Sequence, residues 1–387
     1  MRKDSGRANE RLDFADVVEE KALFNSRASN YLLPGDRDAE SNGSFSFPVF
    51  RPEGQRFGQC LFLGHGLNET SYLKLNYWAK ALCHTLKMPV LIFPLSFHLN
   101  RRPSSWLMRM RSLSRSRSEI EGNRCSSPFN AVISHRLAEM PERFFRGALQ
   151  SYWDTKDLLL LIRKGQFETM TGRGEQILAP TARINFLGYS ISGYLYLALA
   201  MLMGDDLLTD SRVVLFSSGT HIRDMNPVSV LVIDGDAFRR SKQFYEEGYK
   251  EQASRELRCW LEGEETGLWF KRLLFNEGGR NQLHDFTRTL SNRILIIGDP
   301  HDEVFPLEAI KTNLGGFLNC HAMALGRHEF PFNISDLEGK SFQALAEEIR
   351  GSEFPSDKYR DRFAEWIDVI RDFLCPAGAV VSGDFDS

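Results

Sequence analysis

The sequence lacks the features that mark membrane, secreted and metal-binding proteins. None of its apolar runs approaches the roughly 18 continuous residues that a transmembrane helix needs, and its first residues, MRKDSGRANERLDF, contain no apolar core of a signal peptide. Cysteine is scarce and forms neither a C-x-x-C pair nor a His/Cys cluster at metal spacing; the six residues stand at positions 60, 83, 125, 259, 320 and 375. We therefore expect a soluble cytoplasmic protein with reduced core cysteines, no membrane span and no metal.

An excess of charge of one sign is also missing. The 387 residues carry a formal net charge of −3, which gives no general reason to expect a nucleic acid or a membrane surface as the partner. Hydrophobic residues make up 42% of the chain, which is enough for one large globular domain with a smaller insertion.

One stretch departs from this balance. Residues 96–135 are basic and rich in serine, but they hold only three aromatic residues, Phe97, Trp106 and Phe129, and lack the interleaved aromatics that a single-strand binder would need. We predict a solvated insertion at the rim of a site, where an anionic substrate is a candidate ligand and nucleic acid is not favoured. The arginines of this stretch are Arg101, Arg102, Arg109, Arg111, Arg115, Arg117 and Arg124.

Short apolar runs alternate with helical patterns along most of the chain. Phe45–Arg51 predicts an early edge strand, because Pro48 cannot donate a hydrogen bond to a neighbouring strand. Tyr72–Lys87 has apolar residues at helical spacing. The strand, helix, strand order predicts a parallel sheet with right-handed crossovers. Six further runs have the length of buried strands: Cys60–Leu63, Pro89–Leu95, Ile184–Leu187, Arg212–Phe216, Arg293–Ile297 and Phe317–Leu325.

The composition also predicts the division of the chain. Residues 1–45 are expected to form a polar N-terminal extension with a modest helical patch at Phe14–Phe24 and a loop at Gly35–Ser44. The remaining segments are a core at 46–217 and 291–375, a helical and heavily charged insertion at 218–290 between its two parts, and a tail at 376–387.

The stretch from Arg183 to Leu202, RINFLGYSISGYLYLALAML, combines a buried strand, a turn of small residues and a helix that is apolar all round. In a nucleophile elbow of this form the serine takes a strained conformation, so the residues two before and two after it must be small. Gly188 and Ser192 meet that demand around Ser190. Ser190 is therefore the candidate nucleophile, and the alternative is a helix N-cap serine after a strand.

Three further loops follow predicted strands. Residues 64–67, Gly-His-Gly-Leu, come upstream of the elbow; Asp299 and Asp302 follow the strand at 293–297; and His328 follows the last strand. Together with Ser190, these loops follow one another in a characteristic order and spacing. By these features, residues from about 46 to 375 resemble the α/β-hydrolase superfamily of the serine hydrolase type, with kinship to a bacterial branch. The resemblance implies a mostly parallel sheet with an antiparallel early strand and helices on both faces.

The resemblance also implies a catalytic triad that needs no cofactor. Ser190 would be the nucleophile, His328 the general base, and Asp302 the acid that fixes the histidine tautomer. Asp299 lies nearer the strand end and remains the alternative acid, and a turn or N-cap role is the alternative for either carboxylate. His321 lies within the last predicted strand, so we expect it to be packed rather than catalytic.

The same resemblance places an oxyanion hole and a cap. Its N–H groups would come from Ile191, directly after the nucleophile, and from Leu67 or its neighbour Gly66. His65 and His98 lie just past strand ends and are candidate substrate-binding residues, with a structural role as the alternative. Residues 218–290 stand where this superfamily carries a helical cap, and their aromatic residues would line an acyl or alcohol pocket as well as form the core of the cap.

These features lead to one hypothesis and one alternative. The hypothesis is a serine hydrolase that cleaves a carboxylic ester or thioester, a small-molecule acyl substrate, through an acyl-enzyme intermediate. The alternative is a non-catalytic protein of the same fold that binds a ligand or a partner.

Overall fold

The short apolar runs come together in one central sheet. In the computed structural model, residues 14–54, 56–171, 176–208, 210–275, 280–334 and 340–376 are described. The strand order among them is β1-β2-β4-β3-β5-β6-β7-β8. The strands are β1 Val17–Asn25, β2 Ser44–Pro52, β3 Phe57–Leu63, β4 Val90–Leu91, β5 Leu178–Tyr189, β6 Val213–Phe216, β7 Ile294–Gly298 and β8 Asn319–Ala322.

The sheet is parallel from β4 to β8 and antiparallel only at its early end. β1 pairs with β2 and β2 with β4 in antiparallel register, whereas β4, β3, β5, β6, β7 and β8 are parallel neighbours. This mostly parallel sheet, with an antiparallel early strand and helices on both faces, is the α/β-hydrolase fold that the sequence predicted. Because parallel strands end at the same edge, the loops after β3, β5, β7 and β8 meet there.

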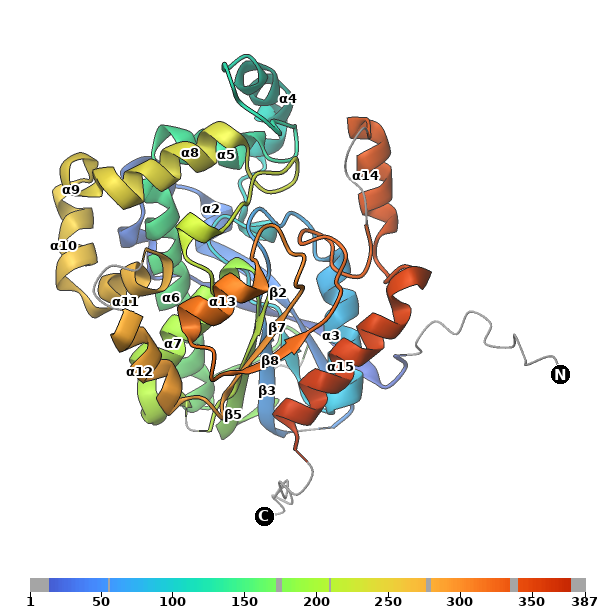
Figure 1. The fold of residues 1–387 in the computed structure, drawn as a ribbon. Helices are drawn as coiled ribbons and strands as arrows, with labels where there is room; N and C mark the ends of the chain where they lie inside the picture. The colour runs from blue at the N-terminus through green and yellow to red at the C-terminus, as the bar shows by residue number, and fades with distance from the viewer. Residues whose placement is uncertain are drawn as a thin grey trace.

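Helices cover both faces of the sheet (Figure 1). On one face α3 (Leu73–Leu86) and α15 (Arg360–Leu374) bury Trp78 and Trp366 against the strands. On the other face α6 (Glu142–Arg163) and α7 (Ile191–Leu208) bury Leu158 and Leu197. α7 is apolar all round because it lies between the sheet and α6. No helix in the described part of the chain has the length and apolarity that crossing a bilayer requires.

Most of the other helices lie in the segments that connect the strands. The insertion expected to be helical at 218–290 is helical, and α13 begins directly after Pro306. These helices are α1 Pro34–Arg37, α2 Glu40–Gly43, α4 Ser105–Ser118, α5 Ala131–Glu139, α8 Gly235–Gln243, α9 Tyr249–Gln252, α10 Arg255–Gly263, α11 Glu265–Leu274, α12 Arg280–Thr289, α13 Leu307–Leu314 and α14 Phe342–Gly351.

The helical patch expected at residues 14–24 is wrong. Val17–Asn25 is strand β1, in which Glu20, Ala22 and Phe24 are buried at a period of two. The same pairing makes β2 an interior strand rather than the predicted edge, because β1 covers one side of it and β4 the other. Residues 17–45 therefore contribute to the fold instead of extending from it, while residues 1–13 of the expected extension and 377–387 of the expected tail lie outside the described residues.

The expectation of core cysteines holds for two of the six. Cys60 and Cys83 are buried, but Cys125, Cys259 and Cys320 are exposed. Cys259 lies in α10 and Cys320 in β8, each on an outer face, whereas Cys125 lies in the loop between α4 and α5.

The basic stretch is not solvated throughout, because two of its arginines are internal. Arg101 is fully buried; its Nη2 lies 2.7 Å from Oδ2 of Asp154, and its guanidinium lies 4.2 Å from the centre of the Phe45 ring. Burial raises the pKa of Asp154 although Arg101 opposes it, and burial lowers the pKa of Arg101 although Asp154 opposes it. Arg101 is thus a structural ion, whereas Arg109, Arg111 and Arg115 are exposed on α4.

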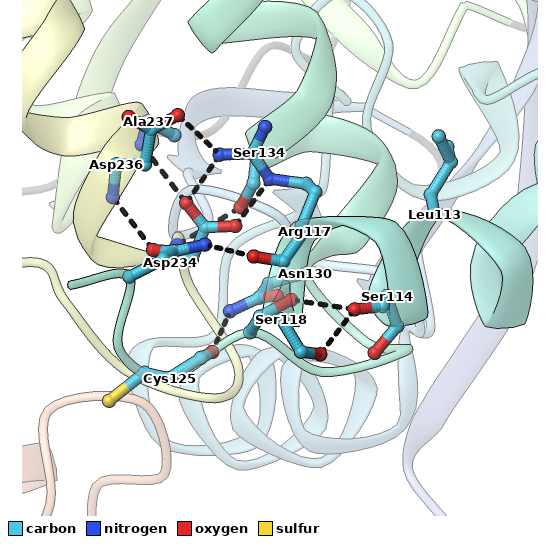
Figure 2. Close-up of polar contacts among 12 residues, drawn as sticks. Leu113, Ser114, Arg117, Ser118, Cys125, Asn130, Ser134, Asp234, Asp236 and Ala237 are labelled. Carbon is cyan, nitrogen blue, oxygen red and sulfur yellow. Dashed lines mark hydrogen bonds and ion pairs between the residues drawn. The ribbon is translucent and has the colours of Figure 1, made fainter. Parts of the chain in front are cut away.

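Arg117 connects the basic stretch to the insertion at 218–290 (Figure 2). Its Nε and Nη2 donate to the two carboxylate oxygens of Asp234 at 2.5 and 2.7 Å, and Nη2 also reaches Asp236 at 3.2 Å. Asp234 is the N-cap of α8 and accepts from the N–H of Ala237. Because the pair is bidentate and buried, it fixes the start of α8 against α4.

Removing one partner of the buried Arg101–Asp154 pair tests how much the fold depends on it. Asp154→Ala leaves a guanidinium in the core without its carboxylate, and we expect the free energy of unfolding to fall by about 3–5 kcal/mol. Urea unfolding followed by circular dichroism measures this. Replacing both partners, Arg101→Met with Asp154→Leu, should recover a large part of the loss, because no unpaired charge remains. An Asp154→Ala variant as stable as the wild type would contradict the structural role of the pair.

Candidate active site

Ser190 forms a sharp turn between strand β5 and helix α7. β5 ends at Tyr189 and α7 begins at Ile191, so Ser190 alone makes the turn. Its φ of +57° lies in the left-handed region, which is costly for a residue with a Cβ atom. Its N–H donates to the carbonyl of Phe216 at 2.9 Å, which ties the turn to β6. This is the geometry that the elbow pattern predicted.

The small residues around the turn are needed for steric reasons. A Cβ atom on Gly188 would lie 2.4 Å from Cα of Gly193, and one on Gly193 would lie 2.2 Å from Oγ of Ser218. At Gly64, a Cβ atom would lie 2.3 Å from Cβ of Ser192. The strand, the helix and the loop after β3 therefore approach one another at distances that only glycine permits.

Ser190 lies at one end of a chain of hydrogen bonds. Its Oγ is 2.9 Å from Nε2 of His328, and Nδ1 of His328 is 2.9 Å from Oδ2 of Asp302. All three side chains are buried. An ionised carboxylate only accepts, so Nδ1 carries the proton that it donates to Asp302, and Nε2 is left to accept from the serine hydroxyl.

The structure distinguishes the two candidate carboxylates. Asp302 reaches His328, and its second oxygen accepts from the N–H groups of Val304 and Phe305, both at 2.9 Å. Asp299 instead accepts from the N–H groups of His301 and Leu325. Asp302 is therefore the partner of the histidine, and Asp299 holds together the loops after β7 and β8.

The electrostatic environment keeps Asp302 ionised. Burial alone would raise the pKa of this carboxyl, but the nearby His328 and the hydrogen bonds from His328 and the Phe305 N–H lower the pKa below its ordinary value. The negative charge of Asp302 is thus present at neutral pH.

Three contacts hold the loop that carries His328. The Tyr189 hydroxyl donates to the His328 carbonyl, and Nζ of Lys74 donates to the carbonyl of Glu329 at 2.6 Å. The Phe305 ring stacks on the imidazole with the ring centres 5.1 Å apart. Lys74 also pairs with the half-buried carboxylate of Glu69. No signal in the sequence pointed to these residues. Lys74 looks like an ordinary residue of helix α3, and the elbow pattern does not specify the residue before its serine, which is Tyr189 here.

A cavity of about 1120 Å³, counting its open mouth, has Ser190 and His328 in its wall. We call it the serine cavity. The predicted oxyanion residues Gly66, Leu67 and Ile191 also line it. Ile191 is the first residue of α7, so its N–H has no acceptor within the helix. The insertion and its neighbours contribute a largely apolar wall that includes Ile222, Met225, Leu231, Val232, Phe238 and Tyr245.

The aromatic residues of the insertion serve mainly as core. Phe244, Tyr245, Phe270 and Phe275 pack with Phe145 of α6 in one cluster. Tyr245 of this cluster also lines the serine cavity, and so does Phe238, which does not belong to the cluster.

His65 is not brought to the serine cavity. It is fully buried, donates from Nδ1 to the Gly66 carbonyl at 2.9 Å and accepts at Nε2 from the Leu95 N–H at 2.9 Å. Burial and the neighbouring His98 lower its pKa well below the ordinary value, so the ring is neutral. Its hydrogen bonds shape the loop after β3, which is the structural alternative that the sequence left open.

His98 lies in the wall of a second cavity. This side cavity, of about 1050 Å³ counting its mouth, adjoins the serine cavity and shares Leu67 and Ile191 with it. Nδ1 of His98 donates to the Ser96 carbonyl at 2.8 Å, and its ring packs against His65. Burial lowers its pKa from 6.5 to about 4, so it is neutral at physiological pH.

Comparison with known proteins places the chain in a family. The sequence profile described as "Family of unknown function (DUF6051)" matches residues 4–345. The chain belongs to this family. None of the curated proteins matches this DUF6051 member.

Solved structures of esterases are similar to the DUF6051 chain at low identity. An esterase domain of a Rhodothermus marinus protein aligns over 86% of this chain and 96% of its own, with 12% identity and a TM-score of 0.40. A Pyrobaculum calidifontis esterase covers 92% and 85%, with 13% identity and a TM-score of 0.41. Carboxyl esterase 2 from the fungus Tuber melanosporum covers 95% and 88%, with 11% identity and a TM-score of 0.43. At TM-scores this low, the assignment of the fold rests on the strand order and the elbow of the DUF6051 chain itself.

The buried histidines make the stability of the protein sensitive to acid. The folded-state pKa of His98 lies near 4 and its ordinary value is 6.5, so between these pH values the unfolded chain binds a proton that the folded chain excludes. The free energy of unfolding should therefore fall as the pH falls through this window, by as much as about 3 kcal/mol from His98 alone. His98→Asn, which keeps a donor for the Ser96 carbonyl, should flatten the dependence in urea titrations. His301→Asn, at an exposed position, should leave it unchanged. An equally steep dependence in His98→Asn would contradict this assignment.

Proposed function

We propose that this protein is a serine hydrolase that cleaves a carboxylic ester or thioester through an acyl-enzyme intermediate. The observation that carries the proposal is the hydrogen-bonded chain from Ser190 through His328 to Asp302, at the wall of an apolar cavity. A serine becomes nucleophilic when a base accepts its proton, and the base works best when a third group orients it.

In the proposed first step, His328 takes the proton of Ser190 as Oγ bonds to the substrate carbonyl carbon. The ionised Asp302 stabilises the imidazolium that forms. The carbonyl oxygen becomes an oxyanion, for which the N–H groups of Ile191 and of Leu67 or Gly66 are the proposed donors. Each such donor contributes about 10²–10³ in kcat.

In the proposed second step, the oxyanion collapses and the bond from the carbonyl carbon to the alcohol or thiol breaks. His328 gives its proton to the leaving group, and the acyl group stays on Ser190. A water molecule then repeats the sequence, with His328 as its base, and releases the acid. Residues 218–290 act in this proposal as a cap whose apolar side chains exclude bulk water from the intermediate.

Labelling by a fluorophosphonate probe tests the activated serine directly. We expect the wild type to be labelled and Ser190→Ala and His328→Ala to lose the label, because one removes the nucleophile and the other its base. Ser192→Ala is the matched control, since Ser192 Oγ donates to the carbonyl of His65 instead. Absence of labelling in folded wild-type protein would sink the proposal and favour the non-catalytic, ligand-binding alternative.

The two loop carboxylates should differ in their effect on ester hydrolysis. Asp302→Asn removes the negative charge that fixes the His328 tautomer, and we expect kcat to fall by about 10⁴. Asp299→Asn disturbs hydrogen bonds between loops, so its main effect should be a loss of about 1–3 kcal/mol in stability. Steady-state kinetics on p-nitrophenyl butyrate, together with urea unfolding, separates the two. The reverse order of effects on kcat would assign the acid role to Asp299.

A further inference from the structure

A second cavity begins beside the proposed nucleophile and leads away from the histidine. The side cavity shares five wall residues with the serine cavity: Leu67, Leu137, Phe144, Ile191 and Leu274. Two of these, Leu67 and Ile191, are the proposed sources of oxyanion donors. His328 and Phe305 line the serine cavity only.

The side cavity follows one face of helix α7. Ile191, Leu195, Ala198 and Leu202 stand at helical spacings of four, three and four, and all line the cavity. The stripe starts directly after Ser190 and runs for about 16 Å at the helix rise of 1.5 Å per residue. This is close to the length of an extended dodecanoyl chain. The opposite walls come from α6, α5 and α11, with Ala148, Ile133 and Phe270 among them.

Most polar groups in this wall are engaged with the protein, and Nε2 of His98 is an exception that has no hydrogen-bond partner among the described residues. Ser151 Oγ donates to the Gly147 carbonyl at 2.8 Å, and Ser96 Oγ donates to Gln150. Arg136 and Arg143 both pair with Asp36. His98 is neutral at physiological pH because burial holds its pKa near 4. The cavity therefore offers an apolar surface, which suits a methylene chain better than a charged or sugar-like group.

The position of the general acid decides which part of a substrate enters which cavity. His328 must lie within hydrogen-bond reach of the leaving oxygen or sulfur to protonate it. The leaving group therefore lies on the side of Ser190 that faces His328, in the serine cavity. With the carbonyl oxygen directed to the oxyanion donors, the acyl substituent is left on the opposite side, where the side cavity opens.

We propose that the side cavity binds the acyl chain of the substrate, a linear aliphatic chain of medium to long length, and that the serine cavity receives the leaving group. This inference rests on the proposed hydrolase function and adds its substrate class. Each methylene that enters the side cavity leaves water, so kcat/KM should rise by up to about fourfold per methylene until the cavity is filled.

A series of p-nitrophenyl esters, from acetate through butyrate and octanoate to dodecanoate, tests whether the side cavity binds the acyl chain. In the wild type, kcat/KM should rise along the series. Ala198→Phe fills the middle of the α7 stripe and should lower the octanoate-to-acetate ratio of kcat/KM by at least about tenfold. Ala364→Phe, the same substitution on the exposed face of α15, should keep the wild-type ratio. Ala148→Phe makes the same test from the α6 wall if Ala198→Phe does not fold.

Two outcomes overturn the proposal: a wild-type series with no dependence on chain length, or an Ala198→Phe variant whose ratio is unchanged. Calorimetric titration of Ser190→Ala with dodecanoate separates this failure from that of the hydrolase function. We expect binding that weakens at least about tenfold when Ala198→Phe is added. Such binding, together with a wild type that hydrolyses no ester, would contradict the hydrolase function but support the side cavity as a site for an acyl chain. Hydrolysis by the wild type with neither chain-length dependence nor dodecanoate binding would support the hydrolase function and contradict the side cavity as an acyl-chain site.

Discussion

The left-handed backbone of Ser190 is the constraint on which the rest of the site depends. A residue with a side chain adopts a φ of +57° only where its surroundings force it to, and here three glycines make the necessary close approaches. Gly188 and Gly193 bring β5 against α7, and Gly64 brings the loop after β3 against the same turn. The strain is offset by the buried sheet, which fixes the strand before the turn and the helix after it.

Around this turn, groups from distant parts of the chain hold the imidazole in place. Asp302 comes from the loop after β7, Lys74 from α3 and Tyr189 from the end of β5. Each contributes a hydrogen bond in a buried region, where such bonds are strong and where an unpaired partner is costly. The candidate base is thus positioned before any ligand arrives, which is the condition under which polar groups stabilise developing charge.

The pattern of the sequence predicted the elements whose environment is simple. Buried strands read as apolar runs, and the helix at 73–86 shows apolar residues at helical spacing. The strand at 17–25 was misjudged because its alternation of charged and apolar residues is short and resembles a weak helical pattern. Arg101 was misjudged because nothing near it in sequence announces that Asp154 will lie 2.7 Å away. Long-range ion pairs leave no local signal.

By itself, the sequence determined where most of the parallel strands fall along the chain, the turn at Ser190 and the candidacy of Asp302 and His328, because each depends on residues within a few positions of one another. The tertiary structure alone decided that Asp302 and not Asp299 meets the histidine, that His65 is a buried part of the β3 loop, and that a second cavity runs along α7. The physical reason is that these outcomes depend on which side chains the packed sheet brings together. Local propensity and spacing fix an element, but only the packing of elements from distant parts of the chain fixes a contact or a cavity.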